Sequence, residues 1–177
     1  IGLNNKDFME HYYKSQSLHY DSYRYKMLHG KKQLMYSIPW HNMKNKKILL
    51  LAGGTGDLTE YFSEWISEID EVVISDISQN MINIANNRIE KYKWNNVKTR
   101  IEDVLDNENI LKKESGKYDY VILTYSLTMI PKWPKALECV KKYLKKDGYL
   151  AISDFSLTKY QSFFSKMFWK SLFANSN

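Results

Sequence analysis

Short apolar runs alternate with amphipathic stretches along most of the chain. Five runs have the length and bounds of strands in a sheet, at positions 48–51, 72–74, 97–101, 118–123 and 149–152. Four of them are largely apolar, whereas the run at 97–101 is short and flanked by charge. Between the first two runs, apolar residues such as Leu58, Phe62 and Trp65 recur at helical spacing. This alternation predicts βα units built around a parallel sheet.

Helix signals lie between and after the predicted strands. Ser78 is a candidate N-cap for the helix after the second strand, and residues 133–144 form an amphipathic helix. Thr158, with Gln161 three residues later, opens a final helix. We therefore predict one α/β domain with a Rossmann-like fold: a helical N-terminal cap at 1–44, a core at 45–156 with a mainly parallel twisted sheet and helices on both faces, and a C-terminal helix at 157–177.

Composition narrows the class of protein. The chain has 177 residues, of which 44% are hydrophobic, which is enough for one domain with a buried core. A net charge of +6 is a moderate excess, so we expect no nucleic-acid partner, while an anionic surface remains a compatible one. Cys139 is the only cysteine, and no apolar run approaches the roughly 20 residues that cross a bilayer. These features favour a cytoplasmic location, with any membrane contacted at its surface.

A glycine-rich loop, AGGTGD at 52–57, directly follows the first predicted strand. Glycine lacks a Cβ, so such a loop lets the backbone approach a ligand, although a simple tight turn would also use glycines. Asp57 stands where a dinucleotide would place its pyrophosphate, and a carboxylate there repels phosphate. A cofactor that carries an ammonium and a sulfonium group is compatible with Asp57. The alternative interpretation is an ordinary acidic residue in the first turn of a helix.

Two further carboxylates follow predicted strands. Asp76 ends the second strand about 20 residues after the loop, the offset at which an acidic side chain binds ribose hydroxyls in such folds. The alternative role for Asp76 is to begin the next helix, a position that Ser78 already fills. Asp103 follows the third strand, where its carboxylate or a neighbouring amide would reach an adenine amino group, although many loops contain an aspartate.

These residues resemble a known family. Residues 47–58, 74–81 and 119–127 are similar to class I S-adenosylmethionine-dependent methyltransferases, in particular to the ubiquinone/menaquinone C-methyltransferase branch, and the likeness covers roughly residues 46–156. The resemblance implies that Gly54 and Gly56 pack against the methionine portion of the cofactor, Asp76 binds the ribose and Asp103 the adenine. The remaining residues that it assigns to the cofactor site are Ala52, Gly53, Asp57, Ile77, Met81 and Val104.

The sequence departs from that family at two points. Leu50 occupies the position in the first strand where the family usually has an acidic residue, so Asp57 or a backbone carbonyl would have to bind the methionine ammonium. Family members also complete the sheet with two further strands, for which few residues follow the fifth predicted strand. We therefore expect either a shortened sheet or a piece of a longer enzyme.

Other segments point to a methyl acceptor. Residues 20–31, residues 125–133 and the pair Asp154-Phe155 resemble the methyltransferase that makes the betaine lipid diacylglyceryl-trimethylhomoserine. This resemblance implies stepwise N-methylation of a lipid head-group amine. Lysines and aromatic residues interleave in the C-terminal segment, which is compatible with contact to an anionic membrane surface, although an aromatic helix face more often packs in the core.

Candidate residues for the acceptor site lie at the carboxyl ends of the last two predicted strands. Tyr125, Ser126 and Asp154 stand there and are candidate catalytic residues, with strand-end capping or packing as the alternative. Tyr20 and Arg24 are candidates for a helical lid over the cofactor. The four histidines lack partners at metal-ligand spacing, so we expect no metal site. Competing functions are C-methylation of a quinone precursor and a non-catalytic module that binds the cofactor or a membrane.

Overall fold

The computed structural model of the protein describes Leu28 and residues 30–155. Within them, five strands form one parallel sheet in the order β3-β2-β1-β4-β5. The strands are β1 (Lys47–Leu51), β2 (Glu71–Asp76), β3 (Val97–Ile101), β4 (Tyr118–Thr124) and β5 (Leu144–Ser153). The predicted Rossmann-like α/β fold is confirmed. The predicted C-terminal helix and most of the predicted N-terminal cap lie outside the described residues.

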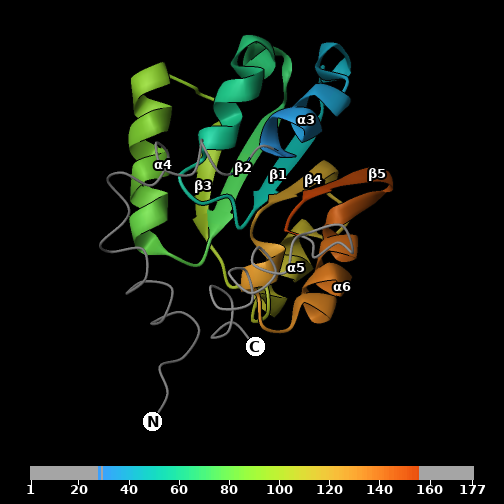
Figure 1. The fold of residues 1–177 in the computed structure, drawn as a ribbon. Coiled ribbons are helices and arrows are strands. Elements are labelled where there is room, and N and C mark those ends of the chain that lie inside the picture. Colours follow the sequence, from blue (N-terminus) through green and yellow to red (C-terminus); the bar gives the residue numbers. More distant parts are fainter. Residues whose placement is uncertain (1–27, 29, 156–177) are drawn as a thin grey trace, which may run out of the picture.

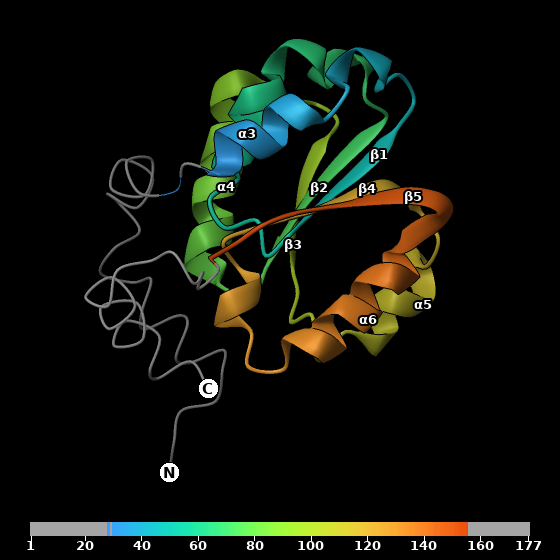
Figure 2. The ribbon, with the colours of Figure 1, turned by 45° about the vertical axis from the view of Figure 1, so that its right-hand side comes forward.

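Helices cover both faces of the sheet, so that the molecule has three layers (Figures 1 and 2). One face carries α3 (Gly30–Ser37), η1 (Trp40–Asn42), η2 (Asp57–Glu68) and α4 (Gln79–Tyr92). The other face carries α5 (Glu108–Glu114), η3 (Leu127–Met129) and α6 (Trp133–Tyr143). Among the described helices, none has the length and apolar character needed to cross a bilayer.

The two layers of core come from the alternation of side chains along each strand. In β1, Ile48 and Leu50 enter the cluster under α4 and η2, whereas Leu49 and Leu51 enter the cluster under α5 and α6. All four side chains are at most 1% exposed. The continuous apolar run at 48–51 therefore reflects burial on both faces of the sheet. Leu50 is part of the core and does not reach the ligand side of the loop.

Local signals explain where most helices begin and end. Ser78 is the N-cap of α4, and its side chain accepts a hydrogen bond from the backbone N–H of Met81, as predicted. The helix predicted after the glycine loop is present as η2, a 3₁₀-type helix interrupted at Phe62. Phe62 stacks on Trp40 with a ring-centroid distance of 4.3 Å. Tertiary packing thus overrides a regular α-helix at that point.

Candidate functional site

A cavity opens at the carboxyl ends of β1, β2 and β4. It is lined by the loop after β1, the end of β2, residues 102–104 after β3, residues 124–126 and 129–130 after β4, and Lys31 of α3. The space amounts to about 780 Å³, with the solvent at its mouth included. Parallel α/β folds bind ligands at this end of the sheet, where the strand order reverses between β1 and β4.

Ten residues that the sequence assigned to the site line this cavity. They are Ala52, Gly53, Gly54, Asp57, Asp76, Ile77, Asp103, Val104, Tyr125 and Ser126. Gly56, Met81 and Asp154 are described but do not line it. Tyr20 and Arg24 lie outside the described residues, so a lid built from them remains a prediction.

The glycine loop has the backbone that its sequence predicts. Gly54 and Gly56 adopt positive φ angles of 57° and 68°, a region that favours glycine. A Cβ on Gly53 would lie 3.0 Å from the Leu50 carbonyl oxygen, and one on Gly56 would lie 2.7 Å from Ile74 Cδ1. A Cβ on Gly54 would meet nothing within 4 Å, because this residue faces the open cavity. Two glycines therefore allow close packing, and the third borders the space for a ligand.

Asp76 links the ends of β1 and β2. Its Oδ2 accepts a hydrogen bond from the Gly54 backbone N–H at 2.9 Å, and its Oδ1 accepts one from the Ser78 N–H at 2.9 Å. The residue is only 7% exposed and lines the cavity. Each carboxylate oxygen can accept two hydrogen bonds, so these contacts hold the carboxylate in place while it faces a ligand. This geometry fits a ribose diol.

Asp57 is paired with a residue that the sequence did not single out. Lys31 Nζ lies 2.6 Å from Asp57 Oδ2, and the two side chains are 11% and 26% exposed. Both residues line the cavity. Lys31 stands in the first turn of α3, and its distance of 26 residues from Asp57 in the chain left no local pattern to reveal the contact.

The segment after β3 forms the wall beyond Asp76. The Glu102 backbone N–H donates to the Asp76 carbonyl at 2.9 Å, which keeps this segment beside the end of β2. Asp103 Oδ1 accepts a hydrogen bond from the Leu105 N–H at 2.9 Å, so the Asp103 side chain also stabilises its own turn. Val104 is buried beside it. The wall combines an apolar surface with polar backbone groups, as an adenine ring requires.

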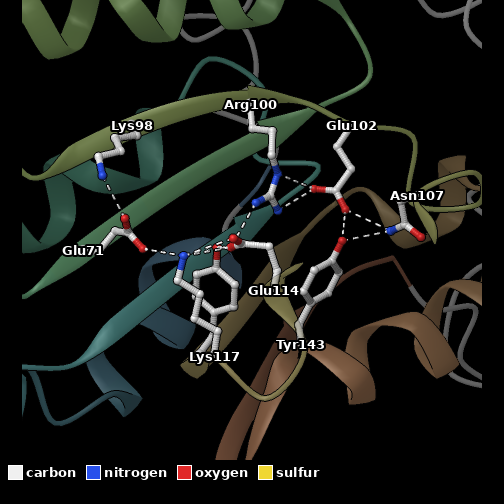
Figure 3. A network of polar contacts seen from close by, with 9 residues as sticks. Glu71, Lys98, Arg100, Glu102, Asn107, Glu114, Lys117 and Tyr143 are labelled. Atoms are coloured by element: carbon white, nitrogen blue, oxygen red, sulfur yellow. Dashed lines mark hydrogen bonds and ion pairs between the residues drawn. The ribbon is translucent and has the colours of Figure 1, made fainter. Parts of the chain in front are cut away.

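A buried ionic network supports this wall from behind (Figure 3). Glu102 Oε2 accepts hydrogen bonds from Arg100 at 3.1 and 2.7 Å, and its Oε1 accepts from Asn107 and from the Tyr143 hydroxyl. The Glu102 side chain has no exposed surface. Burial, together with the neighbouring Glu102 carboxylate, raises the pKa of Tyr143, which keeps this phenol a donor. The network fixes residues 100–107 and keeps the carboxylate of Glu102, a cavity-lining residue, paired with Arg100.

The predicted catalytic residues at the ends of β4 and β5 differ in position. The Tyr125 hydroxyl accepts a hydrogen bond from the Gly30 backbone N–H at 2.8 Å, and Tyr125 has a positive φ of 52°. Ser126 is 9% exposed, and its Oγ has no hydrogen-bond partner among the residues that the structure describes. The Asp154 carboxylate accepts hydrogen bonds from Leu127 N–H and Thr128 N–H at 2.7 and 3.2 Å, which orders the start of η3.

The remaining assigned residues support the loop from below. Met81 is fully buried at the start of α4, and Gly56 packs against Ile74. Within residues 28 and 30–155, no group of acidic, histidine or cysteine side chains has the arrangement of a metal site. The arrangement as a whole therefore fits a nucleoside-containing ligand held by backbone, carboxylates and apolar walls.

Comparison with known proteins gives the family. The sequence pattern of the ubiE/COQ5 methyltransferase family matches residues 6–174. The ubiquinone/menaquinone biosynthesis C-methyltransferase UbiE of Pectobacterium carotovorum is 32% identical over 113 residues, which cover 64% of this chain and 44% of that protein. The chain thus spans less than half the length of this relative.

Solved structures share the fold. A putative S-adenosylmethionine-dependent methyltransferase from Methanococcus maripaludis matches with a TM-score of 0.65 at 15% identity, over 80% of this chain and 63% of that chain. The trans-methyltransferase CalH, solved in complex with SAH, matches with a TM-score of 0.58 at 25% identity, over 68% of this chain and 35% of that one. Together with the family match, the geometry leads to one conclusion: the chain belongs to the ubiE/COQ5 methyltransferase family, a family of S-adenosylmethionine-dependent enzymes.

Proposed function

We propose that the protein transfers a methyl group from S-adenosylmethionine to a small-molecule acceptor bound in the cavity. The observation that carries this proposal is the hydrogen bond between the Gly54 N–H and the Asp76 carboxylate. It places the glycine loop, which has open space beside Gly54, next to a fixed carboxylate at the ends of β1 and β2. In the proposed complex Asp76 binds the ribose hydroxyls. Residues 102–104 contact the adenine, and the glycine loop contacts the methionine portion.

Methyl transfer depends more on the position of the acceptor relative to the methyl group than on a reactive side chain of the protein. The bound cofactor supplies a methyl group activated by a sulfonium: an electron pair of the acceptor forms the new bond while the S–CH₃ bond breaks, leaving a neutral thioether. Holding the acceptor in line supplies roughly 7 to 11 kcal/mol of the barrier reduction. We propose that Tyr125 and Ser126 line the acceptor side of the cavity. Asp154 acts through η3, as a positioning residue.

The acceptor that we favour is an aromatic carbon of a quinone precursor. The relatives named as ubiquinone/menaquinone C-methyltransferases support it, since their likeness covers 64% of this chain. Met129 and Ile130 give the wall beside Ser126 an apolar part, which suits a flat ring. After the new C–C bond forms, the ring carbon releases its proton to solvent and the ring becomes aromatic again.

A lipid head-group amine is the second candidate. It rests on the likeness of residues 20–31 and 125–133 to the betaine-lipid enzyme. The second of these segments contributes Tyr125, Ser126, Met129 and Ile130 to the cavity wall. Most of the first segment lies outside the described residues, which include Leu28, Gly30 and Lys31 of it. The aromatic C-terminal segment that would contact a membrane surface lies wholly outside them. An amine acceptor must be neutral so that its electron pair is available, and it loses a proton to solvent after transfer.

One experiment separates the acceptors. The protein is incubated with methyl-labelled S-adenosylmethionine and a total lipid extract, and the labelled products are identified by mass spectrometry. We expect label in a quinone ring; label in an amine head group would replace the carbon acceptor with the lipid acceptor. Absence of label from every product, in a protein that binds the cofactor, would overturn methyl transfer. Asp76→Ala should abolish labelling, whereas the exposed Asp147→Ala should leave it unchanged.

A further inference from the structure

The ionic network around Glu102 has a cost that stability alone does not explain. The Glu102 side chain has no exposed surface and the Arg100 side chain is 20% exposed, so both charges are largely removed from water. A buried pair of this kind often stabilises a fold no more than well-packed apolar side chains would. The network (Figure 3) reaches a residue of the cavity wall, and this location indicates a positional role.

Glu102 lines the cavity through its main chain. The residue is 4% exposed although its side chain has no exposed surface, so the part that meets the cavity is backbone. The carboxylate accepts four hydrogen bonds, two from Arg100 at Oε2 and one each from Asn107 and Tyr143 at Oε1. A carboxylate has about four acceptor sites, so none is left for a ligand. Glu102 therefore holds the wall in place and does not bind the ligand with its charge.

The partners of Glu102 come from three separate elements. Arg100 lies in β3, Asn107 immediately precedes α5, and Tyr143 ends α6. Arg100 also pairs with Glu114 at the end of α5, at 3.2 Å. Burial opposes the charge of Arg100, but the Glu102 carboxylate raises the pKa of Arg100 above its usual value, which keeps this donor charged. The segment after β3 is thus held from both ends of α5 and from α6.

The segment that is held in this way carries the group that faces the base in the proposed complex. Asp103 lines the cavity, and its Oδ1 accepts a hydrogen bond from the Leu105 N–H at 2.9 Å, which orients the side chain. A carboxylate accepts a hydrogen bond from the 6-amino group of adenine and repels the 6-carbonyl oxygen of hypoxanthine. This choice depends on position, because a displacement of about 1 Å can cost a factor of about 100.

We propose that the partners of Glu102 are positioning residues that determine which nucleobase the site accepts. Arg100, Asn107 and Tyr143 all belong to the described residues, and none of them lines the cavity. They act through Glu102, whose fixed main chain keeps the neighbouring Asp103 carboxylate in place. The inference rests on the proposed function, because it presumes that the adenine of the cofactor lies against the segment after β3.

Two tyrosines of the network give a matched pair of variants. Tyr143 and Tyr118 are both fully buried, their rings meet edge to face with centroids 6.1 Å apart, and each hydroxyl donates to a glutamate. Tyr143 donates to Glu102 at the cavity wall, whereas Tyr118 donates to Glu114 at the far end of α5. Tyr143→Phe and Tyr118→Phe thus each remove one buried hydroxyl, and only the first removes a contact to the cavity wall.

Calorimetric titration with two ligands tests the proposal without measuring catalysis. The ligands are S-adenosylhomocysteine and S-inosylhomocysteine, which differ at position 6 of the base, where an oxygen replaces the amino group. The measured quantity is the ratio of the two affinities in the wild type, Tyr143→Phe, Tyr118→Phe and Asn107→Ala. Urea unfolding of each variant shows whether it folds, and whether the two tyrosine variants lose similar stability.

The proposal predicts a change in this ratio. The wild type should favour S-adenosylhomocysteine by about 100-fold or more, because hypoxanthine presents an oxygen to the Asp103 carboxylate. Tyr143→Phe should reduce the preference by about 10-fold, mainly by weakening S-adenosylhomocysteine, and Asn107→Ala should act in the same direction. Tyr118→Phe should keep the ratio of the wild type.

Three results would overturn the inference while leaving the proposed function intact. The first is a wild-type ratio near one. The second is an unchanged ratio in Tyr143→Phe and Asn107→Ala, even if both affinities fall together, since the network would then be purely structural. The third is an equal change of the ratio in Tyr118→Phe. Failure of both ligands to bind the wild type would instead contradict the proposed function. If Tyr143→Phe does not fold, the ratio in Asn107→Ala decides the same question.

Discussion

The two ends of the sheet hold their acidic residues in different ways. At the amino end, Asp119 of β4 accepts hydrogen bonds from the Lys47 N–H at 2.9 Å, from Lys145 at 2.8 Å and from Lys46 at 3.3 Å. At the carboxyl end, Asp57 and Asp76 line an open cavity. At the amino end, the Asp119 carboxylate is thus bound by partners within the protein. At the carboxyl end, Asp57 and Asp76 border space that a ligand can occupy.

Backbone conformation differs between the two ends in its cause. At the amino end, Asn45 and Lys93 have positive φ angles of 59° and 55°. Asparagine tolerates this region, and Lys93 is the C-cap of α4, where a left-handed residue is common. At the carboxyl end, Ala52 and Tyr125 have positive φ angles of 50° and 52°, and both line the cavity. The comparison teaches that the strained residues of the carboxyl end stand where they shape the cavity.

The largest expected loss of stability comes from Gly56→Ala beneath the cavity. The new Cβ would lie 2.7 Å from Ile74 Cδ1 at a φ of 68°, so the free energy of unfolding should fall by about 2–3 kcal/mol. Gly54→Ala is the matched control, because it has a similar φ and no neighbour within 4 Å; it should cost about 1 kcal/mol. Equal losses in urea unfolding would show that packing under the loop is not what requires glycine.

Asp119→Asn should lower the free energy of unfolding by about 1–2 kcal/mol at neutral pH. The loss stays this small because the partner lysines, Lys46 and Lys145, are 43% and 44% exposed and solvent screens their charges. Burial opposes ionisation of Asp119, but hydrogen bonds from Lys145 and the Lys47 N–H hold its pKa below the usual range. The folded state therefore binds fewer protons. The stabilisation is present above the unfolded pKa of about 4 and is lost as the pH falls through the folded pKa.

Urea unfolding at several pH values checks this expectation. The difference between wild type and Asp119→Asn should be largest near neutral pH and should shrink below pH 4. A difference that stays constant with pH would show that the Asp119 charge contributes nothing. Binding of S-adenosylhomocysteine to this variant should stay within about twofold of the wild type, since Asp119 does not line the cavity.

Asp154→Ala should produce a smaller effect at the carboxyl end. It removes the acceptor for the Leu127 and Thr128 N–H groups at the start of η3, a loss comparable to that of a helix cap, about 1 kcal/mol. Thr128→Val removes only the side-chain hydrogen bond of 2.8 Å to Asp154 and should cost less. If Asp154→Ala abolished cofactor binding at unchanged melting temperature, Asp154 would belong to the cavity wall.

The smallest effect is expected on the surface between the two ends. Lys141 and Glu138 in α6 form an ion pair in which both side chains are 67% exposed. Lys141→Met should change the free energy of unfolding by no more than about 0.3 kcal/mol, because solvent screens such pairs. A loss above 1 kcal/mol, measured by urea unfolding at low and high salt, would contradict this assignment.

Much of the fold was predictable from the chain itself. The apolar run at 48–51, the glycines after it and Ser78 before α4 are local signals, and each produced the expected element. The predicted start of β5 was wrong, since β5 begins at Leu144, five residues earlier than expected. The pattern missed this part of the strand because residues 145–147 are polar. The short helix α5 carried too weak a pattern to be predicted.

The site was predictable only where one segment carries its own signal. Asp76 ends β2 and the glycine loop directly follows β1, so the sequence indicated that both lie at the carboxyl end of the sheet, where the cavity is. Lys31 and its partner Asp57 are far apart in sequence, as are Tyr125 and Gly30, with 95 residues between them. Contacts of this kind depend on how α3 packs over the sheet, and no periodic pattern within one segment encodes that packing.

The most direct test of the account is a calorimetric titration of wild type, Asp76→Ala and Asp119→Asn with S-adenosylhomocysteine. We predict one site per chain in the wild type, affinity for Asp119→Asn within about twofold of it, and a loss of about 100-fold or more in Asp76→Ala, which removes the carboxylate proposed to bind the ribose. Equal affinity in the wild type and Asp76→Ala would contradict the account, because the carboxyl end of the sheet would then not hold the cofactor.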